Sequence, residues 1–395
     1  MSIAPLDARP AGLPPPSTAA REHSDRLIAQ IVHAIAEAEG WVSFADYMHA
    51  ALYAPGLGYY AAGAHKFGVA GDFATAPELT PLFGRTLAAQ LAQVLKQVAE
   101  GEIVEVGPGS GRLAADVLTT LAEQDALPAR YLLLEVSPDL RERQRQHLAA
   151  RVPELMARVA WIDALPERWR GALIANEVLD AVPAHLVARR SGEWLERGVT
   201  VDATARLAFG DRSLTAGMLR NMAQTRFPAA GDYVSELNPA AEALVTTLAQ
   251  RCERGLMLLV DYGFPAAEYY HPQRDTGTLM AHYRHHALAD PFFHPGLSDI
   301  TAHVDFSAVA RAGFAGGMTV AGFSTQAQFL VACGVLKQLA RCGDPESADY
   351  LRAVSAVQKL TSPAEMGELF KVLALTRGLD IELIGFGAGD RSHRL

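Results

Sequence analysis

The sequence has few cysteines and no long apolar run, and both absences narrow what the protein can be. It holds three cysteines in 395 residues, Cys252, Cys333 and Cys342, and no two of them are spaced as a CxxC pair. Such a sparse, odd set argues against a disulfide framework and favours reduced thiols, so we expect a cytoplasmic protein. No segment approaches the roughly 20 consecutive apolar residues of a membrane-spanning helix, so we expect no membrane insertion.

Several signatures of hydrolases and metal sites are also missing. The chain has no HExxH motif, no paired Cys/His set and no GxSxG elbow, which disfavours a zinc protease and a serine hydrolase of the common type. Five histidines do fall within 22 residues, at His282, His285, His286, His294 and His303. Their spacing matches no standard ligand set, so we expect no metal site and leave open whether these histidines have a function.

Positive charge is in deficit. There are 35 lysines and arginines against 44 aspartates and glutamates, a net charge of −9. This balance offers no general attraction to a phosphate backbone, so nucleic acid is a poor partner, and a cationic protein substrate fits slightly better. Half of the residues are apolar, which is typical of a globular chain.

What is present is an alternation of apolar strand-like and helical stretches. The strand-like ones are 102–106, 131–135, 159–162, 172–175 and 255–261, and helical patterns cover 112–122, 138–150 and 238–252. Such alternation implies right-handed crossovers and a mostly parallel sheet. We therefore predict an α/β, Rossmann-like fold.

Outside this alternation the pattern changes. We expect a disordered tail at 1–23, a helical N-terminal region at 24–98 with a lid loop at 54–81, and a core at 99–265 with inserted strands at about 184–236. A loop-rich C-terminal region at 266–395 would complete the substrate lobe and the sheet. Capping boxes predict helix starts at Ser43 and Ser362, and a further helix is expected at 326–339.

A glycine-rich loop, Glu105-Val106-Gly107-Pro108-Gly109-Ser110-Gly111, joins the first strand of the alternation to its helix. Glycines at such a turn let backbone N–H groups approach a ligand closely. Arg112 stands where the dinucleotide fingerprint GxGxxG has its third glycine, which weakens a nicotinamide reading. The acidic-x-Gly-x-Gly-x-Gly form instead resembles motif I of class I S-adenosylmethionine methyltransferases. The cofactor-binding candidates here are Glu105, Gly107, Pro108, Gly109 and Gly111.

Two acids follow the next strands. Glu135 ends the strand after the loop, where a carboxylate can accept both hydroxyls of a ribose. This supports a nucleoside without choosing between adenosylmethionine and NAD. Asp163, after the third strand, is a candidate acceptor for the adenine amino group, with a helix N-cap as the alternative.

Motifs spread over the chain carry a more specific resemblance. They are Tyr53-x-Pro55-x-x-Gly58-Tyr59-Tyr60, Gly71-Asp72-Phe73-x-Thr75-Ala76-Pro77-Glu78, the glycine loop, Ala175-Asn176-Glu177-Val178-Leu179-Asp180-Ala181-x-Pro183, Asp261-Tyr262-Gly263, Gly277-Thr278-Leu279 with Tyr283, Asp299-Ile300-Thr301-x-His303-Val304-Asp305-Phe306 and Met366-Gly367-x-x-Phe370-Lys371-Val372-Leu373. In their order and number they resemble the MidA-like family of class I methyltransferases, which includes the mitochondrial complex I assembly arginine methyltransferase. The matches run from about residue 42 to 374.

The resemblance implies an S-adenosyl-L-methionine cofactor, a class I core with an added helical region and an inserted lobe, and a protein substrate. It points to arginine N-methylation, with a respiratory complex subunit as a possible target. The lid residues Thr75 and Pro77 would contact the methionine end of the cofactor, with Glu78 near the sulfonium. The alternative is a loop that only covers the sheet edge.

The acceptor in such enzymes enters beside the fourth strand, which here ends at Asn176-Glu177. We expect Glu177 to clamp the guanidinium bidentately, with Asn176, Asp180 and Glu78 as further catalytic candidates; on a helical turn Glu177 and Asp180 could share a face. The alternative is that these acids cap a helix after the strand. The competing function is a cofactor-binding assembly factor with little turnover, and a nicotinamide oxidoreductase is a third option.

Overall fold

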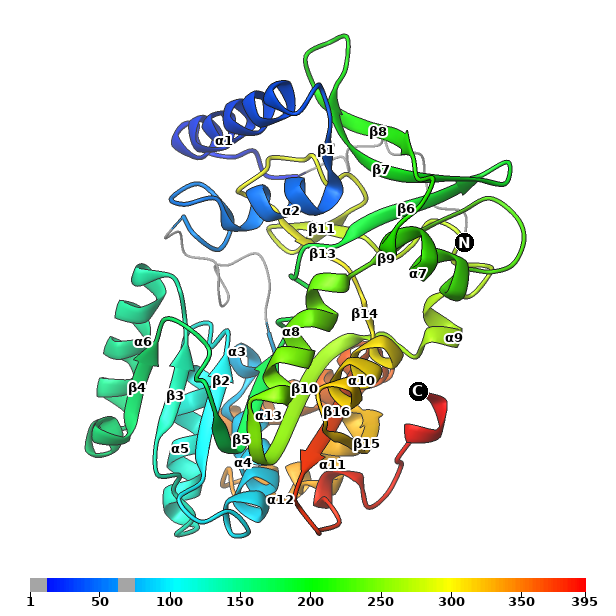
Figure 1. Cartoon of the computed structure of the whole chain (residues 1–395). Helices are drawn as coiled ribbons and strands as arrows, with labels where there is room; N and C mark the ends of the chain where they lie inside the picture. Colours follow the sequence, from blue (N-terminus) through cyan, green and yellow to red (C-terminus); the bar gives the residue numbers. More distant parts are fainter. Residues whose placement is uncertain (1–12, 63–74) are drawn as a thin grey trace. The chain divides into compact units, whose positions relative to one another are not determined.

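The computed structural model describes residues 13–62 and 75–395 of the chain (Figure 1). The chain forms two compact units. The first comprises Met1–Phe73, Asp180–Ala241 and Ala266–His303, and the second comprises Ala74–Leu179, Glu242–Pro265 and Val304–Leu395. The domain division predicted from the sequence differs from these two units and stays a prediction. The expected tail at 1–23 falls partly, and the expected lid loop at 54–81 partly, on residues outside those described.

The second unit is built on one large sheet. Its strands are β2 (Glu102–Val106), β3 (Tyr131–Leu134), β4 (Val159–Ile162), β5 (Trp169–Asn176), β10 (Cys252–Phe264), β14 (Val304–Asp305), β15 (Thr319–Thr325) and β16 (Phe370–Arg377). The order is β15-β16-β10-β5-β2-β3-β4, with β14 beside β10. The pairs from β10 to β4 are parallel, whereas β16 is antiparallel to both of its neighbours. The predicted α/β fold with a mostly parallel sheet is confirmed.

Helices cover this sheet. They are α3 (Ala76–Leu79), α4 (Pro81–Leu95), α5 (Arg112–Glu123), α6 (Pro138–Arg151), α8 (Pro239–Gln250), α10 (Phe306–Ala315), α11 (Gln326–Ala332), α12 (Val335–Ala340), α13 (Ala348–Thr361) and α14 (Met366–Leu369). Apolar side chains of α4, α5, α11 and α13 form one buried cluster with residues of the central strands, while Figure 1 shows α8 and α10 in front of the sheet. Burial of this cluster supplies the main driving force for folding.

The strand order places the functional edge. Strand β2 pairs with β3 on one side and with β5 on the other, so the chain reverses its direction of winding at β2. Ligands of open α/β sheets bind at the carboxyl ends of the strands at such a switch point. Here that point lies between the glycine loop after β2 and Asn176-Glu177 at the end of β5.

The first unit contains two smaller antiparallel sheets. One holds β1 (Val42–Ser43), β6 (His185–Arg190), β7 (Glu193–Val201), β8 (Leu207–Ser213) and β9 (Tyr233–Leu237); the other holds β11 (Met280–Tyr283), β12 (His286–Leu288) and β13 (Asp299–Thr301). Its helices are α1 (Thr18–Glu37), α2 (Phe44–Tyr53), α7 (Met218–Arg226) and α9 (Ala266–Tyr269). A buried cluster that includes Leu27, Phe44 and Val199 joins α1 and α2 to the five-stranded sheet of this unit.

Several local expectations differ from the structure. Helix α1 begins at Thr18, inside the expected tail. The expected helix at 326–339 is two helices, because Gly334 adopts a left-handed conformation with φ of 90°. Ser362 does not start a helix but ends α13, with its N–H bonded to the Gln358 carbonyl. By contrast, Ser43 caps α2 as predicted, accepting from the Asp46 N–H at 3.0 Å.

Candidate functional site

The glycine loop has the backbone that its sequence requires. Gly107, Gly109 and Gly111 all have positive φ, at 64°, 54° and 82°, a region that side chains with a Cβ rarely adopt. Gly107 is exposed, and a Cβ there would lie 3.0 Å from Val178 Cγ2. Pro108 is buried, and Gly111 is the N-cap of α5. The loop therefore presents backbone between β2 and the start of a helix.

Glu105 lies beneath the loop. Its side chain is buried, and its carboxyl accepts a hydrogen bond from the Tyr131 hydroxyl at 2.7 Å. Burial raises the pKa of Glu105 to about 8, although the Tyr131 hydrogen bond opposes this rise. A group so enclosed can support the loop from below, whereas its predicted contact with the cofactor stays a prediction.

Glu135 follows β3 directly and is held by a network. Its Oε1 accepts from the Ser137 N–H at 2.8 Å and its Oε2 accepts from Gln144 Nε2 at 3.1 Å. Burial raises the pKa of Glu135, and the hydrogen bonds from Ser137, Gln144 and Val136 oppose the rise. The carboxylate is thus fixed at the carboxyl end of the second strand, one strand away from the glycine loop.

Gln144, on α6, connects the parts of this site. Its Nε2 also donates to the Gly109 carbonyl at 2.8 Å, and its Oε1 accepts from Trp161 Nε1 on β4 at 2.8 Å. The side chain is fully buried, and all three partners lie in different segments. Sequence reasoning missed Gln144, because a glutamine on a polar helix gives no local signal of such contacts.

Asp163 is placed at the surface. Its side chain is 87% exposed and pairs with Arg141, which also donates to the Ile162 carbonyl at 2.8 Å and the Glu135 carbonyl at 2.6 Å. Residues 163–168 form no helix, so the alternative reading of Asp163 as an N-cap is wrong. Arg141 joins the ends of β3 and β4, and it too was missed.

Asn176 and Glu177 meet at the end of β5. Asn176 Nδ2 donates to Glu177 Oε1 at 3.2 Å, and the same oxygen accepts from the Ala76 N–H at 3.2 Å. The Glu177 N–H continues the sheet ladder to the Val260 carbonyl at 2.8 Å. Asn176 Oδ1 is buried and accepts no hydrogen bond from the part of the chain that the structure describes.

Glu78, on the short helix α3, contacts the glycine loop. Its carboxylate accepts from the Ser110 hydroxyl and pairs with Arg112 Nε at 3.1 Å. The Glu78 side chain is 5% exposed, so its carboxylate is largely shielded from solvent. Thr75 and Pro77 are the N-cap and second residue of α3. Residues 63–74 of the expected lid lie outside those described.

Asp180 belongs to the first unit, and the expected helical turn at 177–180 is absent. Glu177 has a φ of 52°, and bends and turns occupy 177–182. Neither acid therefore caps a helix after β5, although the Glu177 carboxylate accepts from the N–H of Ala76, the first residue of α3. Asp180 is buried, and within its own unit it adds to the rise in the pKa of Tyr60, whose main cause is burial.

The five histidines all fall in the first unit. Burial lowers the pKa of His282. Within residues 13–62 and 75–395, no three His, Cys, Asp or Glu side chains gather in a way that could hold a metal ion. None of the described helices is long and apolar enough to cross a membrane.

The residues at the switch point suit an adenosyl cofactor. The left-handed glycines allow a close backbone approach, Glu135 offers a fixed carboxylate to a ribose, and Val136 beside it exposes 75% of an apolar side chain that could pack against a base. Asn176 Oδ1 is a buried acceptor that receives no hydrogen bond from the described residues, so a bound ligand can donate to it. An α/β sheet with these features defines a class I methyltransferase.

The comparisons with known proteins agree. Residues 86–324 match the family described as "Putative S-adenosyl-L-methionine-dependent methyltransferase". The chain belongs to this family, known as MidA-like, and S-adenosyl-L-methionine is its cofactor. The chain is therefore an S-adenosylmethionine-dependent methyltransferase, as the motifs indicated.

Two curated relatives and two crystal structures illustrate the likeness. A protein arginine methyltransferase NDUFAF7 homolog from Drosophila melanogaster is 30% identical, with 92% of this chain and 88% of that protein covered. Protein arginine methyltransferase NDUFAF7 from Mus musculus is also 30% identical, with 85% and 81% covered. A Burkholderia thailandensis protein bound to S-adenosyl-homocysteine is 48% identical over 97% of this chain and 100% of that one, with a TM-score of 0.94. A native structure of a protein from the same superfamily and organism is 47% identical with the same coverage and a TM-score of 0.90.

The relatives' names correct one expectation. Both curated relatives are named mitochondrial, so the predicted cytoplasmic location is wrong. The prediction depended on sparse cysteines, and reduced thiols do not distinguish the cytosol from another reducing compartment.

Proposed function

We propose that the protein transfers the methyl group of S-adenosyl-L-methionine to an arginine nitrogen of a protein substrate. The observation that carries this proposal is the pair Asn176-Glu177 at the end of β5, beside the switch point. A carboxylate oxygen and a buried amide oxygen lie within one short stretch of backbone there. Two curated relatives are named protein arginine methyltransferases, which supports the same substrate.

The pair suits a guanidinium. Arginine has a pKa of about 12 or higher, so the group enters as a cation with five N–H donors in a planar fork. A carboxylate can bind such a fork through two charge-assisted hydrogen bonds. Asn176 Oδ1 can accept a further N–H, which removes the cost of leaving a buried acceptor without a donor.

Glu177 has two candidate roles, a clamp for the guanidinium and a cap for a helix. No helix follows β5 directly, but the Glu177 carboxylate accepts from the N–H of Ala76, the first residue of the short helix α3, at 3.2 Å. The turnover of Glu177→Gln therefore decides between the two roles. The left-handed φ of Glu177 costs about 1–2 kcal/mol for a residue with a side chain. Such strain is often kept where a side chain must point in a particular direction.

The residues that would hold the cofactor are part of the same proposal. We assign backbone contacts to Gly107 and Gly109 and the ribose hydroxyls to Glu135, while Glu78 holds the loop through Ser110 and Arg112. Bound at this site, the sulfonium supplies an electrophilic methyl group. The protein's part is to hold the acceptor nitrogen in line with it, an effect worth several kcal/mol. The predictions for Thr75, Pro77, Asp163 and Asp180, and for a respiratory complex subunit as target, remain proposals.

The test separates binding from transfer. Purified Glu177→Gln protein is titrated with S-adenosylmethionine, and methyl transfer is followed with labelled cofactor and a cell lysate. We expect cofactor affinity within about threefold of the wild type and transfer lowered by about 100-fold, because one charge-assisted contact of the transition state is lost. Glu123→Gln, at an exposed position on α5, is the matched control and should change neither quantity.

Acid hydrolysis of the labelled proteins identifies the acceptor. Label in methylarginine supports the proposal, and label confined to other residues would overturn it. An assembly factor without turnover would bind the cofactor and label nothing, which would favour the alternative function.

A further inference from the structure

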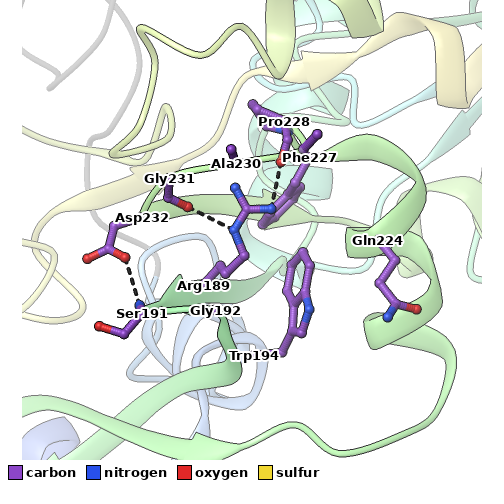
Figure 2. Close-up of a pocket in the computed structure, with 11 residues that line it drawn as sticks. Arg189, Ser191, Gly192, Trp194, Gln224, Phe227, Pro228, Ala230, Gly231 and Asp232 are labelled. Atoms are coloured by element: carbon purple, nitrogen blue, oxygen red, sulfur yellow. Dashed lines mark hydrogen bonds between the residues drawn. The ribbon is translucent and has the colours of Figure 1, made fainter.

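The first unit contains a pocket of about 520 Å³ built around Arg189 (Figure 2). Its walls come from β6, the start of β7, and the segment that joins α7 to β9. They include Arg189, Trp194, Phe227, Ala230, Gly231 and Asp232. Its volume lies within the range of about 300–1,000 Å³ that small-ligand sites occupy.

Arg189 is a buried cation that forms no ion pair with an acid among the described residues. The residue is 7% exposed. Nε donates to the Gly231 carbonyl at 2.8 Å and Nη1 donates to the Pro228 carbonyl at 2.6 Å. Nη2 is buried and has no hydrogen-bond partner among residues 13–62 and 75–395. Carbonyl groups carry no net charge, so they leave the positive charge of the guanidinium uncompensated.

Two guanidinium groups lie near the ring of Trp194. The Arg189 guanidinium lies 5.4 Å from the centre of the Trp194 ring, and the Arg220 guanidinium lies 5.7 Å from the same ring. Phe227 packs against Trp194 with ring centres 5.8 Å apart. Arg220 donates to the Leu214 carbonyl at 2.8 Å and does not line the pocket. The Trp194 ring therefore forms an apolar wall beside the Arg189 guanidinium, which suits a ligand that carries both an acid and a short hydrocarbon stem.

Asp232, an acid that also lines the pocket, already has partners of its own. Asp232 accepts from the Ser191 N–H at 2.8 Å and lies 3.8 Å from Arg190 Nη1. Its side chain is 54% exposed, so it faces solvent more than Arg189 does. Because buried charges are normally paired, the charge of Arg189 indicates a missing anionic partner.

We propose that this pocket binds the carboxylate of a glutamate or aspartate side chain in a partner polypeptide. Arg189 supplies the positive charge, and Trp194 supplies the surface for the side-chain stem. A carboxylate is the anion that a guanidinium pairs with most directly in proteins. The net charge of −9 makes general attraction of an acidic segment weak, so recognition depends on this local ion pair. The site is separate in its chemistry from methyl transfer.

The test uses the full-length protein and two short capped peptides, Ac-Gly-Glu-Glu-Gly-NH2 and Ac-Gly-Gln-Gln-Gly-NH2, together with sodium acetate and inorganic phosphate. The readout is the indole N–H signal of Trp194 in a nuclear magnetic resonance titration. The chain has four tryptophans, and Trp194→Phe assigns the signal. We expect the glutamate peptide to shift it with a Kd of about 1 mM, and the glutamine peptide to bind at least about tenfold more weakly.

The key variant is Ala230→Glu. Ala230 is exposed and lines the pocket with Arg189, so the new carboxylate takes the place of the ligand. We expect loss of the peptide-induced shift and a rise in the melting temperature of about 2 °C, because the buried charge gains a partner. Ala203→Glu, at an exposed position between β7 and β8, adds the same charge elsewhere and should do neither.

Three outcomes would overturn the proposal. The first is equal binding of the two peptides, and the second is an unchanged shift in Ala230→Glu. The third is a response to acetate or phosphate as strong as that to the glutamate peptide, which would indicate a site for small anions. None of these results depends on whether the protein methylates arginine.

Discussion

The buried amide of Gln144 donates a hydrogen bond to the Glu135 carboxylate at 3.1 Å, and the same nitrogen donates to the Gly109 carbonyl at 2.8 Å. One side chain thereby fixes the distance between the glycine loop and the acid at the end of the next strand. These are the two features that we assign to the cofactor. Gln144 is therefore a positioning residue for a site that it need not touch.

Replacing Gln144 with leucine tests this role. The variant keeps a similar size but removes both donors and the acceptor of Trp161, which leaves buried polar groups without partners at about 1–3 kcal/mol. We expect cofactor affinity to fall about tenfold or more, with a lower melting temperature. Calorimetric titration with S-adenosyl-homocysteine and thermal unfolding measure the two effects.

Gln146→Leu is the matched control, because Gln146 lies exposed on the same helix and donates to Glu142 Oε1 at 2.9 Å, away from the glycine loop. It should leave affinity unchanged. If Gln144→Leu lowered stability but bound the cofactor normally, Gln144 would be a structural residue alone.

Gly107 gives a second prediction. An alanine there must adopt φ of 64°, and its Cβ would lie 3.0 Å from Val178 Cγ2 at the exposed tip of the loop. We expect Gly107→Ala to lower cofactor affinity by about tenfold, since the Cβ occupies space that backbone–ligand contacts need. Gly40→Ala is the control: it has φ of 82° with no atom within 4 Å, so it carries the backbone strain without the obstruction. Equal affinities in the two variants would mean that the loop does not approach the cofactor.

Glu78 is the third case. The structure pairs its carboxylate with Ser110 and Arg112, so we expect Glu78→Gln to weaken cofactor binding by about three- to tenfold while turnover at saturating cofactor stays within about threefold. The expected loss of affinity is modest because Arg112 is half-exposed and solvent screens its ion pair with Glu78. Initial rates over a range of cofactor concentrations separate the two effects. A large loss of saturating turnover with normal affinity would instead make Glu78 part of the acceptor site.

The regular elements could be predicted because their signals are local. Ser137 before Pro138 marks the start of α6, and the strand-like stretch at 102–106 is β2 as expected. The network of the site could not be predicted in this way. Gln144 lies 35 residues from Gly109 and 17 from Trp161, and no periodicity reports a contact between such distant segments.

The errors have physical causes too. After β5 the sequence suggested a helical turn, but the Glu177 N–H bonds to Val260 in the neighbouring strand and the chain turns away with a left-handed residue. At Ser362 a serine followed three residues later by glutamate suits a turn as well as a capping box. There the N–H groups of Glu365 and Gly367 both donate to the Ser362 carbonyl, so the chain forms a local turn in place of a capped helix.

Glu105 yields a prediction about pH. Burial raises its pKa to about 8 from an ordinary value of 4.5, so between these values the folded protein holds a proton that the unfolded chain has lost. Stability from this group is therefore full below about pH 4.5 and is lost as pH rises toward and through 8. Between pH 5 and pH 8 the loss of folding stability is on the order of 3 kcal/mol, at 1.36 kcal/mol per pH unit.

We expect Glu105→Gln, which keeps an acceptor for the Tyr131 hydroxyl, to be more stable than the wild type at pH 8. The variant should also show a flatter dependence of stability on pH between pH 5 and pH 8. Denaturant unfolding at several pH values measures the difference between the two proteins, in which titrations common to both cancel. Parallel profiles would show that Glu105 is ionised at neutral pH despite its burial, and would require a cationic partner for it.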